Sequence, residues 1–169
     1  PIDGIVISYD DIEYGKSLGM TGHHPRHSLA FKFKDEIVET TLENIEWTMG
    51  KTGVLTPVAV FSPIEIEGTT VNRASLHNIS VMMETLGTPY LGQKIGVCKK
   101  NMIIPYVSWG EKLPEEYAAS YYLIPDKCPI CGGKTEIRKD NDSEVLVCAN
   151  PDCAGKLLGK LTHFVSRDA

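Results

Sequence analysis

The sequence of 169 residues has no apolar run near the ~18 residues that a membrane-spanning helix needs, so a spanning protein is excluded. No basic, apolar stretch stands at the N-terminus, and no secretory signal is therefore visible. Internal repeats and low-complexity segments are also missing, and the length predicts one domain or two small ones. The chain begins at Pro1 and stops at Ala169, just after a polar run, so we expect it to be a piece of a longer protein.

Basic residues are fewer than acidic ones, and the formal net charge is therefore −5. Residues 1–90 carry 6 Lys/Arg against 12 Asp/Glu, whereas residues 91–169 carry 11 against 10. A net acidic balance does not by itself indicate a nucleic-acid binder. The two halves differ, however, so local surfaces have to be judged separately from the total. Apolar residues make up 42% of the chain, which is enough to build a core.

Four of the five cysteines lie close together, with the spacing C-x2-C, sixteen residues, C-x4-C: Cys128, Cys131, Cys148 and Cys153. Two such pairs across a short loop are typical of a tetrahedral zinc site, since each pair offers two thiolates from one turn. The alternative is a pair of disulfides in an exported domain, against which the spacing and the lack of a visible export signal both argue. Four cysteines would close the coordination shell, so we expect a structural zinc and not a catalytic one.

The middle of the chain has a strand pattern. We predict strands over 38–47, 54–61 and 69–74, two more within 94–107, and a helix over 76–86. Five strands with one helix between the third and the fourth are the pattern of an OB barrel, a fold that commonly binds nucleic acids. A generic small β barrel is the alternative, and periodicity alone does not separate the two. Two short strands are also expected between the cysteine pairs, over 135–138 and 144–147.

The N-terminal stretch predicts two strands around a short helix at 10–18 and a loop at 21–26. In the second strand, the aromatic residues of segment 29–34 share one face, and Lys32 and Lys34 share the other. Two lysines beside aromatic residues form either a solvated edge or a wall for an anionic ligand. The pattern alone leaves both interpretations open.

Several segments carry a recognisable combination of motifs. They are D-G-I-V-I at 3–7, A-F-K-F at 30–33, the OB opening at 47–60, V-N-R-A-S-L-H-N at 71–78, I-I-P at 103–105 and H-F-V-S-R-D-A at 163–169. Together with the four cysteines, these segments resemble the bacterial NAD⁺-dependent DNA ligases over nearly the whole chain. The first two resemble the family's fourth and fifth nucleotidyltransferase motifs. Ser8 stands where the fourth motif ends in lysine, so a divergent paralogue is also considered as the parent.

The resemblance implies a mainly β fold: an OB-fold barrel, a small four-cysteine zinc finger and a remnant of the nucleotidyltransferase domain. The expected division is 1–36 for the end of the adenylation domain, 37–120 for the OB-fold domain, 121–155 for the zinc finger and 156–169 for the start of a helix-hairpin-helix domain. The implied activity is the sealing of nicks in duplex DNA. NAD⁺ and Mg²⁺ would be the cofactors of the full-length parent, besides the structural Zn²⁺.

The implied partners are nicked duplex DNA and the missing adenylation, helix-hairpin-helix and BRCT-type domains of the parent chain, with no membrane. The implied location is the bacterial cytoplasm, in association with the nucleoid. The resemblance assigns Asp3 and Lys32 to catalysis, and Lys32 also to cofactor binding at the α-phosphate. The family's nucleophilic lysine lies in a K-x-D-G motif, which does not occur in this sequence. We therefore expect this chain alone to be inactive.

Four cations are candidate contacts to DNA phosphates: Lys51, Arg73, Lys99 and Lys100. The Lys99–Lys100 pair is equally consistent with a solvated hairpin. Two other functions remain open from the residues. One is a non-catalytic nucleic-acid binder that keeps the OB and zinc-finger modules, and the other is a zinc-stabilised module for protein interaction.

Overall fold

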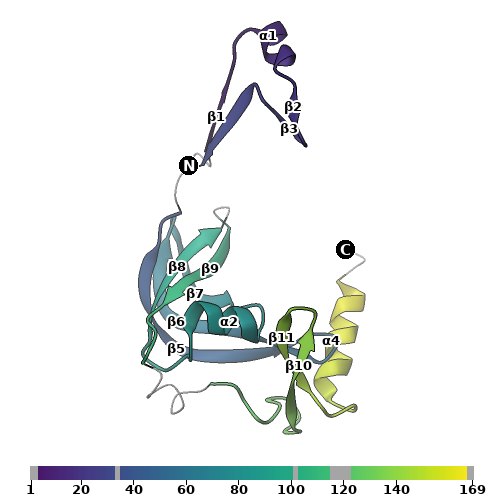
Figure 1. Cartoon of the computed structure of the whole chain (residues 1–169). Helices are drawn as coiled ribbons and strands as arrows, with labels where there is room; N and C mark the ends of the chain where they lie inside the picture. The colour runs from purple at the N-terminus through teal and green to yellow at the C-terminus, as the bar shows by residue number, and fades with distance from the viewer. Residues whose placement is uncertain (1–3, 33–34, 101–102, 115–122, 167–169) are drawn as a thin grey trace. The chain divides into compact units, whose positions relative to one another are not determined.

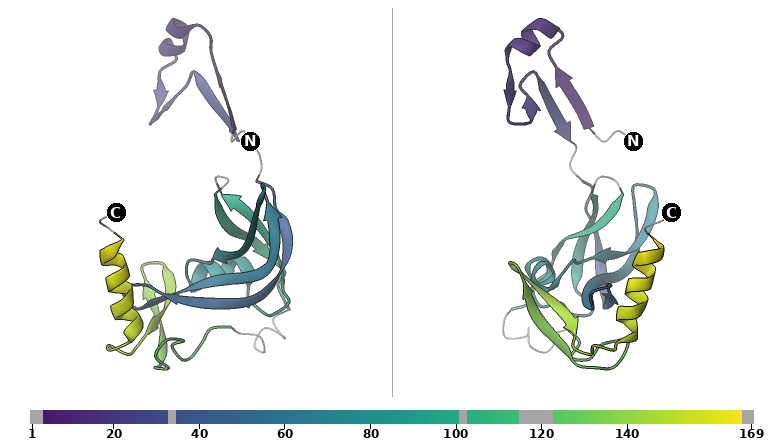
Figure 2. Two further views of the ribbon diagram at one scale, coloured as in Figure 1. Left: turned by 180° about the vertical axis from the view of Figure 1, so that it is seen from behind. Right: turned by 90° about the vertical axis from the view of Figure 1, so that its right-hand side faces the viewer.

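A computed structural model of the chain describes residues 4–32, 35–100, 103–114 and 123–166. The chain divides into two compact units, residues 1–35 and residues 36–169, and each is described by itself. Figures 1 and 2 show their elements from three sides. The described part of the chain is mainly β, as the sequence predicts. Within it, no helix has the length and apolarity needed to cross a membrane.

The first unit is a β-hairpin with a helical insertion. Its strands β1 (Gly4–Ser8) and β4 (Ser28–Lys32) pair antiparallel. Between them lie the helix α1 (Ile12–Ser17) and the two-residue strands β2 (Met20–Thr21) and β3 (His24–Pro25). The predicted helix is confirmed, whereas the predicted loop contains the β2–β3 pairing. The reason is a tight turn in which Gly22 takes a φ of +54°, a region that glycine enters without steric cost.

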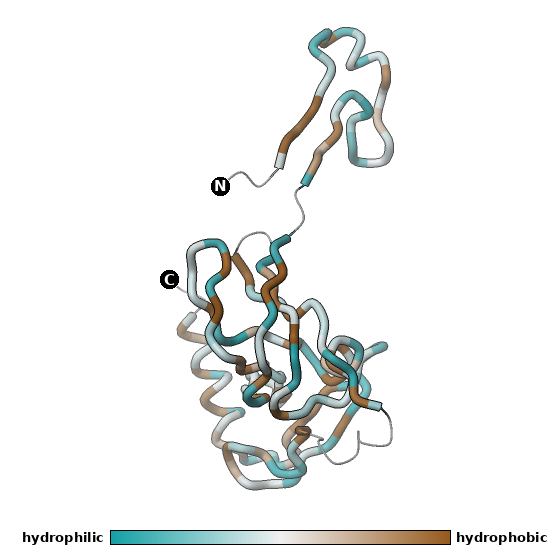
Figure 3. Tube along the Cα trace, turned by 90° about the vertical axis from the view of Figure 1, so that its left-hand side faces the viewer, coloured by the Kyte–Doolittle hydropathy of each residue, from teal (hydrophilic) through white to brown (hydrophobic). Residues whose placement is uncertain are grey.

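The register of the hairpin sorts its side chains onto two faces. Ala30 and Lys32 share one face of β4, and Leu29 and Phe31 share the other, as alternation predicts. Phe33 and Lys34, expected to continue the two faces, lie outside the described residues. Leu29 is 68% exposed and Phe31 55% exposed, and β1 is largely apolar and exposed too (Figure 3). An isolated two-stranded hairpin is at best marginally stable, so the first unit leaves apolar surface that a larger sheet would bury.

The second unit contains a five-stranded barrel. Its elements are β5 (Val38–Met49), β6 (Val54–Ile66), β7 (Thr69–Ser75), α2 (Ile79–Leu86), β8 (Lys94–Lys100) and β9 (Ile104–Gly110). β5 pairs with β6 and with β8, β6 continues to β7, and β8 continues to β9. β7 and β9 are in contact without a ladder between their described residues, so the strands follow the order β5-β6-β7-β9-β8 around the barrel. With α2 between the third and fourth strands, this is the predicted OB arrangement.

The strand β6 is longer than the sequence predicts. Pro63 cannot donate to a strand ladder, which favours a break between a strand at 54–61 and a separate alternating segment at 64–67. In the structure the strand runs through Pro63, and its pairing with β7 shifts register between Val60 and Ile64. A bulge therefore accommodates the proline and bends the strand around the barrel.

The helix α2 begins three residues later than predicted. His77 takes a φ of +61°, a left-handed conformation that a helix interior does not allow. Asn78 then caps the helix, because its side-chain oxygen accepts a hydrogen bond from the Val81 N–H at 2.8 Å. Met82 and Leu86 face inward, and Met83 packs at the margin of the core.

Alternate residues of the strands and the inner side of α2 fill the barrel. The buried set is Leu42, Ile45, Ala59, Phe61, Ile66, Ala74, Leu76, Met82, Leu86, Ile95, Val97 and Val107. Along β6, Leu55, Ala59 and Phe61 are buried while the residues next to them are half-buried, the period of a strand with one face inward. This core fixes the strand ends and turns on which the candidate site is built.

The cysteine-rich segment is continuous with the barrel sheet. Its hairpin consists of β10 (Thr135–Asp140) and β11 (Ser143–Cys148), and the helix α4 (Ala154–Val165) comes after it. β11 pairs with the start of β6, so one sheet includes both the hairpin and barrel strands (Figure 1). A small second core formed by Leu55, Ile79 and Leu146 lies at this junction.

Candidate functional site

The four cysteines predicted as metal ligands converge on one point. Cys128 and Cys131 lie in the turn before β10, Cys148 ends β11, and Cys153 caps α4. All four Sγ atoms lie within 4.8 Å of one another. The Sγ atoms of Cys128 and Cys153 are 4.0 Å apart, and those of Cys131 and Cys148 are 3.6 Å apart. None of the four forms a disulfide, so the disulfide alternative is not the one adopted.

Tight turns hold the first cysteine pair. The Gly132 N–H donates to the carbonyl of Cys128 at 2.9 Å, and the Cys128 N–H donates to the carbonyl of Gly133 at 2.7 Å. Gly132 has a φ of +70°, which an L side chain rarely adopts. The Gly133 N–H also donates to the Cys131 sulfur at 3.4 Å. The glycines after the pair therefore point both sulfur atoms at the same centre.

Two local effects act in opposite directions on the thiols. The hydrogen bond from the Gly133 N–H lowers the pKa of Cys131 to about 6. Burial raises the pKa of Cys148 to about 12 because the buried thiolate loses its hydration. A cysteine binds a metal as its thiolate. A bound cation would supply the positive charge that stabilises the buried thiolate of Cys148. The four sulfur atoms therefore form a cluster that could hold a metal ion.

The cluster is attached to the barrel through the end of β5. The Met49 Sδ lies 3.8 Å from the Cys153 Sγ, and Met49 also packs against the small junction core. The backbone adds a second link, because the Cys148 N–H donates to the carbonyl of Gly53 at 3.1 Å. The cysteine cluster is thus in direct contact with the end of β5 and with the β5–β6 turn.

The helix α4 packs closely on the same turn through two glycines one helical turn apart. A Cβ at Gly155 would lie 2.6 Å from the Ile130 Cδ1 and 2.7 Å from the Met49 Sδ. A Cβ at Gly159 would lie 2.9 Å from backbone atoms of Lys51. At Gly159 the close atoms belong to the backbone and cannot move aside, so the helix approaches the turn more closely than an alanine there would allow.

Lys51 lies on the β5–β6 turn, where its side chain is exposed. Its Nζ lies 2.7 Å from the Nε2 of His163 on α4. Arg73, on β7, forms an ion pair with Glu46 of β5, and both side chains are about half exposed. An exposed pair of this kind contributes at most ~1 kcal/mol, so a phosphate can compete with Glu46 for the guanidinium.

The two lysines at the end of β8 have opposite environments. Lys99 is only 5% exposed, and its ammonium contacts the hydroxyl of Thr69. Lys100 is exposed, and its Nζ lies 3.4 Å from the centroid of the Tyr106 ring. A phosphate contact through Lys99 would require its ammonium to leave Thr69, whereas Lys100 needs no such change. The structure therefore does not present the pair as one solvated hairpin.

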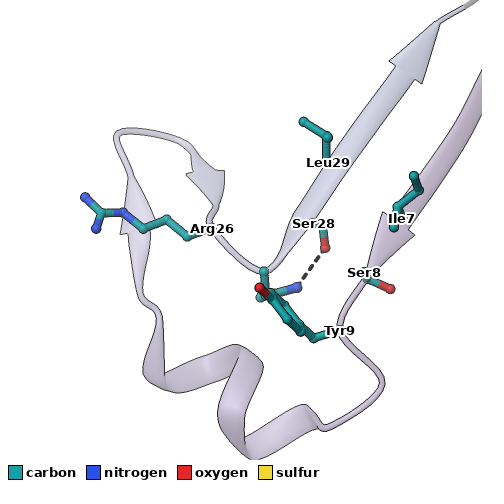
Figure 4. A pocket seen from close by; sticks show the side chains of 7 residues that line it. Ile7, Ser8, Tyr9, Arg26, Ser28 and Leu29 are labelled. Carbon is teal, nitrogen blue, oxygen red and sulfur yellow. Dashed lines mark hydrogen bonds between the residues drawn. The ribbon is translucent and has the colours of Figure 1, made fainter.

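The first unit carries the residues assigned to catalysis by resemblance. Asp3 lies outside the described residues, and Lys32 is exposed at the end of β4. A pocket of about 490 Å³ lies beside the hairpin, lined among others by Ile7, Tyr9 and Leu29 (Figure 4). Inside it the His27 Nδ1 and the Ser28 Oγ form a hydrogen bond of 2.7 Å. Lys32 is not among the residues that line this pocket, so the cavity is separate from the lysine assigned to catalysis.

Sequence reasoning missed three residues around these sites. His163 falls in the H-F-V-S-R-D-A segment, but the sequence does not show that it faces Lys51. Tyr106 comes directly after the I-I-P segment, and an aromatic next to a predicted cationic hairpin is a usable signal. Met49 precedes the β5–β6 turn, and no pattern indicates its contact with a cysteine.

Comparison with known proteins identifies the family. Residues 39–113 match the model of the NAD-dependent DNA ligase OB-fold domain. The chain is 52% identical to a DNA ligase of Ruminiclostridium cellulolyticum, with 100% of the chain and 25% of that protein covered. It is also 52% identical to a DNA ligase of Lachnoclostridium phytofermentans and 43% identical to one of Petrotoga mobilis, again over 25% of each. The comparison with the Lachnoclostridium phytofermentans protein covers 100% of this chain, and the one with the Petrotoga mobilis protein covers 99%.

The chain thus spans about a quarter of the length of the curated relatives it matches. The matched OB-fold domain coincides with the barrel strands, and the comparison with the Ruminiclostridium cellulolyticum DNA ligase covers both cysteine pairs and both structural units. The chain belongs to the NAD-dependent DNA ligase family.

Proposed function

We propose that this chain is the segment of a bacterial NAD⁺-dependent DNA ligase that grips duplex DNA around a nick. The parent protein would seal the nick during replication and repair by joining a 3′-hydroxyl to a 5′-phosphate, in the cytoplasm and in association with the nucleoid. The observation that carries the proposal is the continuous sheet of OB barrel and cysteine hairpin in a chain so similar to these ligases. OB barrels commonly bind nucleic acids, and contacts to phosphates position a protein on a duplex.

The metal proposed for the four cysteines is zinc. In a tetrahedron with Zn–S bonds of ~2.3 Å, neighbouring sulfur atoms lie about 3.8 Å apart. Two of the sulfur–sulfur separations in the cluster, 3.6 Å and 4.0 Å, lie on either side of that value. Since cysteine sulfurs would occupy all four positions, the ion would have a structural role and would activate no water. It would hold the β10–β11 hairpin and the start of α4 on the end of the barrel.

The first unit would complete the adenylation domain of the parent. There Lys32 would contribute a cation to the nucleotide phosphates, with Asp3 as a nearby carboxylate. NAD⁺ and Mg²⁺ would be cofactors of the full-length protein, because this sequence contains no K-x-D-G lysine to accept the adenylate. The exposed apolar faces of the β1–β4 hairpin suit such a role, since the remaining adenylation domain would cover them.

The proposed DNA contacts lie on the strands and turns of the barrel. Lys51 on its turn and Lys100 at its strand end are exposed cations whose partners, His163 and Tyr106, carry no negative charge that would compete with a phosphate. Arg73 would exchange Glu46 for a phosphate, and Lys99 would exchange Thr69. We therefore expect Lys51 and Lys100 to carry most of the binding free energy, with Arg73 and Lys99 contributing less.

Titration of a fluorescent nicked duplex with single-site variants tests this ranking. Lys51→Ala and Lys100→Ala should each weaken binding several-fold on every sequence and make the log–log salt dependence shallower by about one. Lys94→Ala is the matched control, because Lys94 is an exposed lysine at the opposite end of the strand that ends in Lys100. An equal loss in the Lys94 variant would show that general charge and not this surface binds DNA.

A further inference from the structure

A close approach of two potentially cationic side chains in the second unit links two distant parts of the sequence. The Lys51 Nζ and the His163 Nε2 are 2.7 Å apart although they are separated by 112 positions. Lys51 is exposed and His163 is half-buried. Both line a surface pocket of about 420 Å³ between the β5–β6 turn and α4. Figure 1 shows α4 beyond the end of β5 that leads into this turn.

The fold fixes this approach through packing. The glycine face of α4 rests on the turn, with Gly159 against the backbone of Lys51. One helical turn further on, His163 therefore stands over the same turn. The side chain of Lys156 passes within contact distance of Gly53 and covers the other side of the turn. The contact between Lys51 and His163 therefore follows from the packing of α4 on the β5–β6 turn.

Elementary hydrogen-bond chemistry defines the state of the pair. A lysine ammonium has only donors, so His163 accepts the hydrogen bond through an unprotonated Nε2 and carries its proton on Nδ1. If His163 gains a second proton, two cations stand in contact, and the hydrogen bond is lost. An anion placed between them restores a partner to both groups. Protonation of His163 and binding of an anion are therefore coupled.

The surroundings favour an anion. Among the described residues, the pocket lining contains no Asp or Glu, and Lys156 lies beside the same turn at Gly53. The whole helix α4 lacks acidic residues. The hydroxyls of Thr162 and Ser166 also line the pocket, but both donate to carbonyls of their own helix. Among the described side chains that line the pocket, the donors left for a ligand are therefore those of Lys51 and of a protonated His163.

We propose that Lys51 and His163 together bind one phosphate of the DNA backbone, and that His163 takes up a proton when they do so. This inference rests on the proposed DNA-binding function and adds to it a second phosphate ligand and a dependence on pH. Binding that takes up a proton becomes tighter as the pH falls. The helix α4 is then part of the DNA-binding surface, in addition to carrying one of the four cysteines at its start.

The test compares the zinc-loaded chain with His163→Gln, which keeps an acceptor for Lys51 but cannot become charged. Anisotropy of a labelled duplex is measured at about pH 6 and about pH 8, either side of the range in which imidazoles ordinarily titrate. Wild-type affinity should rise roughly three- to tenfold on acidification, with a salt slope steeper by about 0.9. The variant should lose most of both changes. His23→Gln, at an exposed histidine of the first unit, is the matched control and should behave as wild type.

Two results would overturn the proposal. If the His163→Gln variant has the pH and salt dependence of the wild type, His163 is not a phosphate ligand, and the proposed function is unaffected. If the wild-type chain binds no duplex at low salt, both this inference and the proposed DNA-binding function are wrong. If the variant fails to fold, the imidazole proton resonances of the wild type decide the question. The His163 signal should move toward its protonated position when duplex is added, and an unmoved signal would contradict the inference.

Discussion

Replacing Gly159 with alanine is expected to loosen α4 from the β5–β6 turn. The new Cβ would lie 2.9 Å from the Lys51 N and Cα and 3.0 Å from the Gly50 carbonyl carbon. These are backbone atoms of a turn that is held by hydrogen bonds from Gly50 to Val54 and from Gly53 to Gly50. The turn cannot yield as a flexible side chain could, so the helix has to move.

Two opposing contributions set the magnitude. Overpacking a close contact typically costs about 1–3 kcal/mol. Alanine is better than glycine in a helix interior by about 1 kcal/mol. Because the clash at Gly159 is with backbone, we take the upper part of the first range and expect a net loss of about 1–2 kcal/mol in the docking of α4. This corresponds to a roughly 5- to 30-fold increase in the undocked population.

Hydrogen exchange of the α4 amides measures that population directly. The Gly159→Ala variant should exchange faster over 154–165 by this factor, with little change in the barrel strands. Gly155→Ala should have a smaller effect, because its close contacts are with the side-chain ends of Ile130 and Met49. Lys160→Ala provides the baseline for an exposed position of the same helix. Unchanged or slower exchange in the Gly159 variant would refute the packing argument.

Three further predictions concern the metal, the chemistry and the buried lysine. The purified chain should contain one Zn²⁺, and removal of the metal by a chelator should raise hydrogen exchange first over 123–166. Metal-free protein with the same exchange pattern would contradict the proposed zinc site. Incubation with radiolabelled NAD⁺ should leave the chain unlabelled, since no K-x-D-G lysine is present, and a lysine adduct would contradict this. Lys99→Ala should lower the free energy of unfolding in urea by about 1–3 kcal/mol because it removes the hydrogen bond from the buried ammonium to the Thr69 hydroxyl. Lys100→Ala should change the free energy of unfolding little. Equal losses in the two variants would show that the burial of Lys99 does not add to stability.

Much of the fold could be predicted because it depends on local patterns. The period-two alternation of β6 and the spacing of the strands around α2 indicate an OB barrel. The cysteine spacing likewise predicts the cluster, since a C-x2-C turn places two sulfurs on one centre whatever the rest of the chain does. These signals are confined to short segments and need no knowledge of long-range contacts.

The link between the cysteine hairpin and the barrel could not be predicted in this way. It depends on the pairing of Leu146 with Leu55 and of Val147 with Val54, residues about ninety positions apart. Two apolar residues in a short strand give no indication of their partner. The sequence therefore presents the zinc finger as a separate module, although the structure joins it to the barrel sheet.

The environments of Lys99 and Lys100 show a second limit. Adjacent residues of a strand point to opposite faces, so one of the two had to be more buried than the other. Lys99 shares the face of β8 that carries the core residues Ile95 and Val97, so alternation along the strand indicates that Lys99 is the more buried of the two. The sequence does not show that its ammonium finds a partner in Thr69, which is 30 positions away on β7.

The salt dependence of duplex binding by the unmodified, zinc-loaded chain tests the central claim most directly. The affinity for a nicked duplex should fall with rising salt, with a slope of roughly −3 in log K against log salt, as expected for ~3–4 phosphate contacts. The slope should be the same for duplexes of different sequence, because phosphates and shape are recognised. A chain that binds no duplex at low salt, or binds with no salt dependence, would contradict its assignment as a DNA-gripping segment.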